Sequence, residues 1–459
     1  MSSRPHLVVV GGGLAGMAAA LEAADAGAEV VLVERRAHLG GLTWSFERKG
    51  RSFDNGQHVF LRCCTAYRAF LDRIGAADQV HLQDRLDVPV VAPGGRTSHI
   101  ARTALRLPSP LHLGPSLLAY GHLDVAARLR LGRAVRALMA LTLDDPALDG
   151  ESFGAWLARH GQRQAAVERL WDLVVLPTVN VPARDASLAL AAKVFRTGLL
   201  DAVDGADIGW ASVPLGVLHG DNGARALAAA GVDVYLSDAV TAVAAERGGV
   251  HVQTAGRRLT ADATVVALPH EAVGPVVPPG TVGDLSGLGH SPIVNVHLVL
   301  DRRVTDLPLL AAVGSPVQFV FDHTGASGIT GRAGTGGVQC LVISLSAATD
   351  TIGARPEELV RRFHAALGDL LPHARRANLV DGVVSREHTA TFRGTPGTAA
   401  LRPGPATPVP GVFLAGAWCA TGWPATMEGA VRSGTAAARA ALAHAGSAHP
   451  PRPLEEASA

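Results

Sequence analysis

The chain has 459 residues, 48% of them hydrophobic and 18% charged, a composition that indicates a globular protein with a large core and excludes a disordered chain. The formal net charge is +1, from 41 basic and 40 acidic residues, so we expect no nucleic-acid partner. Four cysteines, none of them in a CxxC pattern, exclude a disulfide framework.

Two features of the sequence bear on its location. The first apolar run, Leu7–Val10, is followed at once by glycines, so we expect no secretory signal peptide. The longest uncharged stretches, 107–123 and 307–321, contain proline and glycine, so we expect no transmembrane span. The sequence therefore predicts a cytoplasmic protein and leaves peripheral contact with a membrane surface open.

The first 35 residues predict a strand–helix–strand unit. The β-branched run Leu7–Val10 is typical of a strand covered on both faces. The Ala- and Leu-rich stretch 17–26 predicts a helix that ends at Gly27, and 29–33 predicts a second buried strand. Together these elements form a βαβ unit.

A Gly-x-Gly-x-x-Gly motif joins the first strand to the helix, and an acid follows the second strand. Gly11 permits the tight turn, Gly13 lets the backbone approach a pyrophosphate, and Gly16 lets the helix pack closely on the strand. The helix N-terminus offers free N–H groups to the phosphates, and a carboxylate can accept hydrogen bonds from a ribose diol. The motif predicts dinucleotide binding by Gly11, Gly13, Leu14, Ala15, Gly16, Glu34 and Arg35.

The rest of the chain predicts a mostly helical stretch followed by strands. Helical spacing and proline-containing breaks fill 65–203. Strands are then expected at 232–236, 250–254, 257–260, 263–269, 293–300, 317–321, 338–345 and 411–416. Helices are expected over 356–371 and 427–443, followed by a loose tail.

Two further glycines, Gly40 and Gly41, would allow a second backbone approach to the same pyrophosphate. This arrangement resembles the FAD-binding proteins of the glutathione-reductase type, in the branch of the amine oxidases and phytoene desaturases. The arginine usual after these glycines is Leu42 here. The resemblance implies FAD as the cofactor and an α/β fold in which a mixed helical and β-sheet substrate domain interrupts a Rossmann FAD-binding domain.

The expected division of the chain follows from that resemblance. The FAD-binding domain is assigned 1–64, 204–275 and 390–445. The substrate domain is assigned 65–203 and 276–389, and the loose tail is 446–459.

A second signature lies near the C-terminus. The strand that ends at Gly416 and the run 422–430 resemble the C-terminal flavin motif of the same superfamily, in which amides at a helix start face the flavin. The aspartate usual in that motif is Ala417 here. The resemblance implies further cofactor contacts by Gly40, Gly41, Gly56, Gln57, Val240, Gly416, Ala417, Trp423, Pro424, Met427 and Ala430.

The run Asp-Asn-Gly-Gln-His at 54–58 narrows the resemblance. With the segments 153–157, 176–180 and 421–430, it resembles the squalene-associated FAD-dependent desaturases, the hydroxysqualene dehydroxylases of bacterial hopanoid pathways. That resemblance implies reductive removal of an allylic hydroxyl from hydroxysqualene, which gives squalene and water. It also implies a long-chain isoprenoid substrate and other enzymes of squalene biosynthesis as partners.

Such a reaction needs an acid, because hydroxide is a poor leaving group. The candidates are His58, Asp54 and Glu428, with His58 first because imidazole titrates near neutrality. His58 could instead only bind the backbone or the flavin, and Asp54 could fix its own loop. Glu428 could simply suit the dipole of the last helix. Because only one dinucleotide motif follows a strand, electrons are expected from a separate donor or a substrate.

The apolar helices of 107–200 are the expected substrate-binding region. Four aromatic residues could line a tunnel or, as is commoner for single aromatics on helices, pack in the core: Trp156, Trp171, Phe195 and Trp210. We expect no metal site, because the histidines of this region lack ligand spacing: His112, His122 and His160.

Two other functions stay open at this point. The same fold could carry desaturation of a carotenoid or oxidation of an amine, because the sequence does not fix the redox direction. A non-catalytic prenyl carrier is the other alternative, and the visible absorption of a bound flavin would exclude it.

Overall fold

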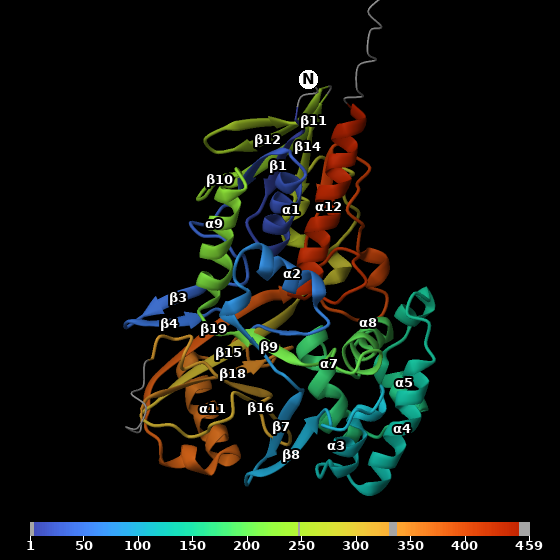
Figure 1. Ribbon diagram of the computed structural model, residues 1–459, viewed down its shortest axis with the longest axis vertical. Coiled ribbons are helices and arrows are strands. Elements are labelled where there is room, and N and C mark those ends of the chain that lie inside the picture. The colour runs from blue at the N-terminus through green and yellow to red at the C-terminus, as the bar shows by residue number, and fades with distance from the viewer. Residues whose placement is uncertain (1–3, 247, 330–336, 449–459) are drawn as a thin grey trace, which may run out of the picture.

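The computed structural model describes residues 4–246, 248–329 and 337–448 (Figure 1). A parallel sheet with two long helices occupies one end of the molecule, where the N-terminus lies. A large, mostly antiparallel sheet and a group of short helices occupy the opposite end. Among the described residues, no helix combines the length and the apolar composition needed to cross a membrane.

The parallel sheet has five strands in the order β10-β2-β1-β14-β20. They are β10 (Asp233–Tyr235), β2 (Glu29–Val33), β1 (His6–Val10), β14 (Ala263–Val266) and β20 (Val412–Leu414). All of β14 and β20 is buried, as expected for strands covered on both faces. The expected α/β class and the opening strand–helix–strand unit are confirmed.

Two helices, α1 (Leu14–Asp25) and α12 (Met427–Ala448), pack side by side against this sheet. Their contact needs a glycine, since a Cβ at Gly434 would lie 2.0 Å from the carbonyl oxygen of Ala15. A Cβ at Gly16 would likewise lie 1.8 Å from the carbonyl oxygen of Gly11. Segments from opposite ends of the chain are thus brought together at backbone-to-backbone distance.

The large sheet has seven strands in the order β19-β15-β18-β17-β16-β7-β8. They are β19 (Leu379–Thr391), β15 (Ser291–Leu300), β18 (Gln339–Leu345), β17 (Phe319–Asp322), β16 (Leu309–Ala312), β7 (Asp87–Ala92) and β8 (Arg96–Ala101). The amphipathic helix α11 (Pro356–Leu370) contacts β15 and β19, and buries Leu359, Phe363 and Leu367.

Three small sheets complete the strands. β3 (Ser45–Arg48) pairs with β4 (Arg51–Asp54), and β9 (Ile208–Ala211) lies between β5 (Val59–Leu61) and β6 (Val80–Leu82). β11 (Val240–Glu246), β12 (Gly249–Thr254) and β13 (Arg258–Ala261) form an antiparallel set. The expected hairpin of 250–260 is confirmed.

The expectation of a mostly helical 65–203 needs a correction, because β6, β7 and β8 lie within it. β6 pairs with β9 and β7 with β16, residues far apart in sequence that a local pattern does not reveal, whereas β7 and β8 form a local hairpin that was not expected from the sequence. The helices of this stretch are α2 (Thr65–Arg73), α3 (Gly114–Ala119), α4 (Val125–Met139), α5 (Phe153–Arg159), α6 (Gln164–Ala166), α7 (Asp172–Val179) and α8 (Leu188–Val194). Outside this stretch, α9 (Asn222–Ala229) contacts β10, and α10 (His270–Val273) follows β14 in the chain.

Three of the four aromatic residues proposed for a tunnel pack in a core. Trp156, Trp171 and Phe195 surround Phe153 with ring-centroid distances between 5.6 and 5.8 Å. All are buried. Trp210 is half-buried and packs on His81. The first three aromatic residues are therefore core residues, the commoner of the two expected roles.

Candidate flavin site and the histidine beside it

The first glycine loop leaves backbone amides free at the start of α1. Gly13 is the N-cap residue in an extended conformation, and no side chain caps the helix. Gly11 has a φ of +103°, and a Cβ there would lie 2.5 Å from the carbonyl oxygen of Ala267. An uncapped helix start with amides exposed by glycine is the arrangement that binds a phosphate.

The second glycine loop touches the first. The amide of Gly40 donates to the carbonyl of Gly12 (2.9 Å), and a Cβ at Gly41 would lie 2.9 Å from the Cα of Gly13. A Cβ at Gly13 itself would meet only the Cα of Gly41, at 3.8 Å. Side chains at these positions would fill the space in front of α1, so the residues present fit a pyrophosphate held by main-chain amides.

Glu34 fixes the first glycine loop through its carboxylate. Its buried carboxylate accepts hydrogen bonds from the amides of Gly12 (2.6 Å) and Arg36 (2.8 Å). Each carboxylate oxygen has a second lone pair, so the expected acceptance from a ribose diol remains open to it. Val240 is half-buried at the start of β11, three residues after Ser237, whose amide donates to the carbonyl of Arg36.

The arginine that contacts this loop is Arg36, and the expected cofactor contact of its neighbour Arg35 stays a prediction. The guanidinium of Arg36 donates to the carbonyl of Gly41 (2.8 Å), whereas Arg35 is exposed. The sequence shows two adjacent arginines, and only the turn after β2 decides which of them faces the glycines.

The C-terminal motif is held against the same sheet. The amide of Gly416, whose φ is +149°, donates to the hydroxyl of Ser433 on α12 (2.8 Å). The indole of Trp418 donates to the carbonyl of Leu268 after β14 (2.9 Å). Ala417 and Met427 are half-buried there. This segment therefore lies at the carboxyl edge of the sheet, where α/β proteins bind ligands.

A buried arginine that the sequence did not single out fixes the next turn. Arg402 donates to the carbonyls of Trp418 (3.1 Å), Cys419 (2.6 Å) and Trp423 (2.7 Å). Burial lowers the pKa of Arg402 to about 10, so it stays charged at neutral pH. Three carbonyls on one cation shape the 418–423 turn, which also carries Pro424 into a buried position.

Trp423 lies between two cations. The ammonium of Lys193 and the guanidinium of Arg432 are each 5.3 Å from the centroid of its ring. The ring is half-buried. An indole just before α12, with Ala430 in the first turn of that helix, fits the expected contact with a cofactor.

Glu428 acts as a cap. Its buried carboxylate accepts hydrogen bonds from the amides of Ala66 (3.2 Å) and Tyr67 (2.7 Å) in the first turn of α2, and from Arg432 (2.6 Å). Three donors converge on this carboxylate, and two of them are amides in the first turn of α2, so the arrangement fits a helix cap.

Asp54 is also committed to local contacts. Its carboxylate accepts hydrogen bonds from the hydroxyl of Ser45 (2.6 Å) and the amide of Leu215 (3.0 Å), and its other oxygen lies 3.3 Å from His323. The side chain is buried. The geometry favours the loop-fixing role over the acid role.

The loop that follows Asp54 joins the two ends of the molecule. The side chain of Asn55 donates to Glu387 on β19 (2.9 Å), and the backbone amide of Gln57 donates to the side-chain oxygen of Asn295 on β15 (3.3 Å). A Cβ at Gly56 would lie 3.2 Å from the ring of His58. The 54–58 loop thus rests on the seven-stranded sheet directly after β4.

The ring of His58 is held by a hydrogen bond within the 54–58 loop. Its Nδ1 lies 3.0 Å from the carbonyl of Gly56, so this nitrogen carries the proton and donates. Burial lowers the pKa of His58, against smaller raising effects of the Gly56 carbonyl, Asp54 and Glu387. In the neutral ring Nε2 is therefore an acceptor at neutral pH, which the spacing of residues did not reveal.

Among the described residues, one group of three side chains could in principle ligate a metal ion. The ligand atoms of His270, Glu271 and His290 lie within 4.8 Å of one another. Nδ1 of His270 is already paired with Glu271 at 3.3 Å, and the other two residues are exposed. Proximity alone points to an ion there, so we assign none.

Comparisons with known proteins identify the family of the chain. Residues 14–442 match the family described as flavin containing amine oxidoreductase. The chain is 26% identical to a zeta-carotene desaturase of Capsicum annuum over 89% of this chain and 76% of that protein. A match to the zeta-carotene desaturase of Solanum lycopersicum reaches 32% identity but covers 37% of this chain and 30% of that protein.

Two further relatives extend over most of the chain. A hydroxysqualene dehydroxylase of Zymomonas mobilis is 27% identical over 88% of this chain and 91% of that protein. The solved structure of a putrescine oxidase bound to putrescine superposes with a TM-score of 0.70 at 19% identity, and covers 96% of this chain and 100% of that one. The second likeness shows the fold, and the family match with the glycine cradle shows the cofactor. The chain therefore belongs to the family of flavin-containing amine oxidoreductases and is an FAD-dependent oxidoreductase.

Proposed function

We propose that the protein removes the allylic hydroxyl of hydroxysqualene reductively, so that a C–O bond is replaced by a C–H bond and water leaves. The support is the relative of that name, which aligns over 91% of its length, and the 54–58 run. The substrate carbon receives a hydride, the leaving oxygen receives a proton, and an external donor must reduce the cofactor before each turnover.

The chain's own residues divide the work. The glycine loops and the start of α1 would hold the FAD pyrophosphate, Glu34 the ribose, and the 416–430 segment the flavin end. Bound FAD in its reduced form supplies the hydride. The residues around 54–58 then have to orient the hydroxyl and provide its proton.

His58 is the proposed proton donor, and its fixed ring carries the proposal. In the neutral ring, Nε2 can accept a hydrogen bond from the substrate hydroxyl. In the protonated ring, Nε2 can donate its proton to the departing oxygen. Because the pKa of His58 is lowered from 6.5, the protonated fraction is small at pH 7 and grows as the pH falls. The rate should therefore rise toward acid pH until the folded pKa of His58 is passed.

The test is single-turnover conversion of hydroxysqualene by the photoreduced enzyme under anaerobic conditions, with His58→Gln as the variant. We expect a loss of about 100-fold or more in rate and a flat pH profile, with the flavin spectrum retained. His99→Gln is the matched control, since His99 is an exposed histidine paired only with Asp87. Equal rates for His58→Gln and wild type would remove the acid role.

A second candidate is desaturation of a carotenoid, which the Capsicum relative favours through its 89% coverage of this chain. In that direction the oxidised cofactor removes a hydride and no leaving oxygen needs a proton. Incubating oxidised enzyme with zeta-carotene, and reduced enzyme with hydroxysqualene, separates the two. Conversion of the carotene alone would overturn the first proposal.

A further inference from the structure

The most exposed apolar side chains of the described residues come from one short stretch. Five of them are between 58% and 69% exposed, whereas no other large apolar side chain exceeds 48%. The five are Leu105, Leu111, Leu118, Val125 and Leu129. Exposed apolar residues concentrated in this way mark an interaction surface.

The five side chains are linked through the backbone of adjoining elements. Leu105 and Leu111 lie in one loop, closed by the bond from the amide of Thr103 to the carbonyl of His112 (2.9 Å). Arg128 on α4 donates to the carbonyl of Leu118 at the end of α3. The two helices lie together at the end of the molecule farthest from the parallel sheet (Figure 1).

The helix α4 shows which side of this region is free. Leu131, Ala134 and Leu138 are buried and define the inner face of the helix. Val125 and Leu129, four residues apart, lie together on the exposed face, followed by Arg133 and Arg136. The outer face therefore changes along its length from apolar to cationic.

The charge of the stretch is strongly one-sided. Residues 102–143 contain six arginines and a single acid, Asp124, whose carboxylate is used to cap α4. In the described part of the chain, Arg102 is paired with Asp207, and the other five arginines form no ion pair: Arg106, Arg128, Arg130, Arg133 and Arg136. The net charge of this stretch is +5, although the whole chain carries only +1.

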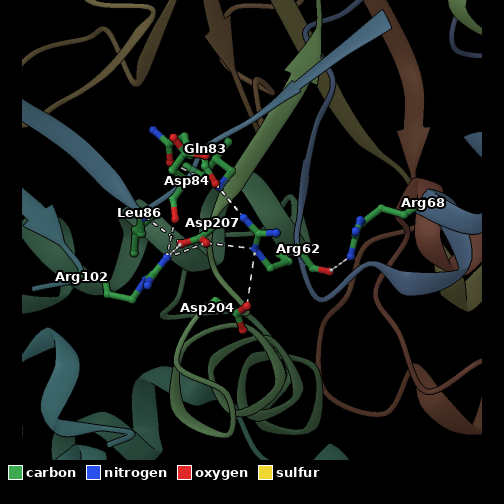
Figure 2. Close-up of polar contacts among 9 residues, drawn as sticks. Arg62, Arg68, Gln83, Asp84, Leu86, Arg102, Asp204 and Asp207 are labelled. Atoms are coloured by element: carbon green, nitrogen blue, oxygen red, sulfur yellow. Dashed lines mark hydrogen bonds and ion pairs between the residues drawn. The ribbon is translucent and has the colours of Figure 1, made fainter. Parts of the chain in front are cut away.

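The base of the leucine loop is held rigidly. The buried carboxylate of Asp207 accepts bonds from Arg62 (3.0 Å), Arg102 (2.8 Å) and the amide of Leu86 (2.8 Å), as Figure 2 shows. An open cleft of about 1000 Å³ runs beside this network and is lined in part by Leu105 and Val203. The loop is thus presented on a fixed frame next to an opening.

We propose that this surface, formed by the exposed side chains of 105–136 and called the leucine–arginine surface, docks on an anionic phospholipid bilayer. Leucines enter the headgroup boundary while unpaired arginines meet lipid phosphates, which is the pattern of interfacial binding. A second copy of the chain is a poorer occupant, because a symmetric contact would place +5 against +5. Uptake of an apolar substrate from the bilayer rests on the proposed function, whereas the docking does not.

The experiment is flotation of the holoenzyme with vesicles of phosphatidylcholine, with and without phosphatidylglycerol. Wild type is expected to float with the anionic vesicles, and less so at high salt. Leu118→Ser with Leu129→Ser should weaken binding about tenfold or more, and Arg133→Glu with Arg136→Glu should abolish the preference for anionic lipid. The matched control is Leu236→Ser with Val380→Ser, which removes exposed apolar side chains elsewhere and should leave binding unchanged.

Three results would overturn the proposal. These are failure of wild type to float with either vesicle, equal losses in the control and the leucine variant, and a change of molar mass in solution caused by the leucine variant. The last would assign the surface to a second copy. Turnover on detergent-dispersed hydroxysqualene reports separately on the proposed function, so its failure leaves the vesicle result intact.

Discussion

At the end of the molecule with the parallel sheet, called the cofactor end, α1 and α12 pack closely because glycines lie at their contacts. Around Asp207 the structure is instead held together by charged side chains. At Gly434 and Gly16, a single added carbon would overlap a backbone oxygen at 2.0 and 1.8 Å. At Asp207, two arginines and an amide converge on one buried carboxylate. The first region is sensitive to volume and the second to charge, and each can be disturbed without the other.

The largest effect should come from adding volume in the cofactor end. Gly434→Ala places a methyl group against Ala15 and must separate α12 from α1. We expect a loss of more than about 3 kcal/mol in the free energy of unfolding, together with loss of bound flavin, because overpacking has no room to relax against backbone. Urea unfolding and the flavin absorbance per chain measure both.

The control for that variant lies in the same helix. Nothing lies within 4 Å of a Cβ at Gly446, so Gly446→Ala should keep the flavin and leave stability equal or slightly higher. If Gly434→Ala also kept its flavin and stability, the close packing of α1 on α12 would not be needed for the cradle.

The second effect concerns charge. Asp207→Asn keeps the volume but leaves Arg62 and Arg102 facing each other without their shared carboxylate. We expect a loss of about 3 kcal/mol, the lower part of the range for a broken buried pair, because both arginines are partly exposed. Urea unfolding measures it, and flavin content should be preserved.

An exposed pair provides the comparison for Asp207. Asp25 and Arg73 form an ion pair near the surface, at 2.7 Å, with 51% and 38% of their side chains exposed. Asp25→Asn should cost at most about 1 kcal/mol. Equal costs for the two aspartate variants would show that burial of the Asp207 network is unimportant.

The last effect depends on pH and concerns two fully buried histidines. Burial lowers the pKa of His219 and of His297 to about 3. Between their unfolded pKa near 6.5 and about 3, the unfolded chain binds protons that the folded chain does not, so stability falls as the pH falls. At pH 5 the cost is about 2 kcal/mol per histidine, and above pH 6.5 it vanishes.

Urea unfolding at pH 7 and pH 5 measures this loss. His297→Leu removes one titrating group from a fully buried position and should reduce the difference between the two pH values by about 2 kcal/mol. A difference that stayed unchanged in this variant would assign the acid sensitivity to other groups.

Much of the cofactor end could be predicted from the sequence. The strands at 7–10 and 29–33, the glycines of both loops and the acid at position 34 all lie where their pattern placed them. The reason is local: a glycine is required wherever a turn or a close approach leaves no room for a Cβ, and that requirement is written at the position itself.

The 54–58 loop with His58 was only partly predictable from the sequence. The sequence identified the 54–58 run, but Asn295 and Glu387, which hold it, are more than 230 residues away in the chain. Whether His58 serves as the acid stays a prediction, as do the domain boundaries. Its tautomer depends on one carbonyl, that of Gly56, which only the folded loop positions.

The sequence by itself determined the nucleotide-binding unit, because strand periodicity and glycine sterics act over a few residues. Only the tertiary structure decided that Arg36 and not Arg35 faces the glycines, that Glu428 caps α2, and that Asp207 joins three strand ends. Only it could show that four leucines stay exposed: Leu105, Leu111, Leu118 and Leu129. Charge pairing and burial depend on which distant side chains meet, and no local pattern carries that information.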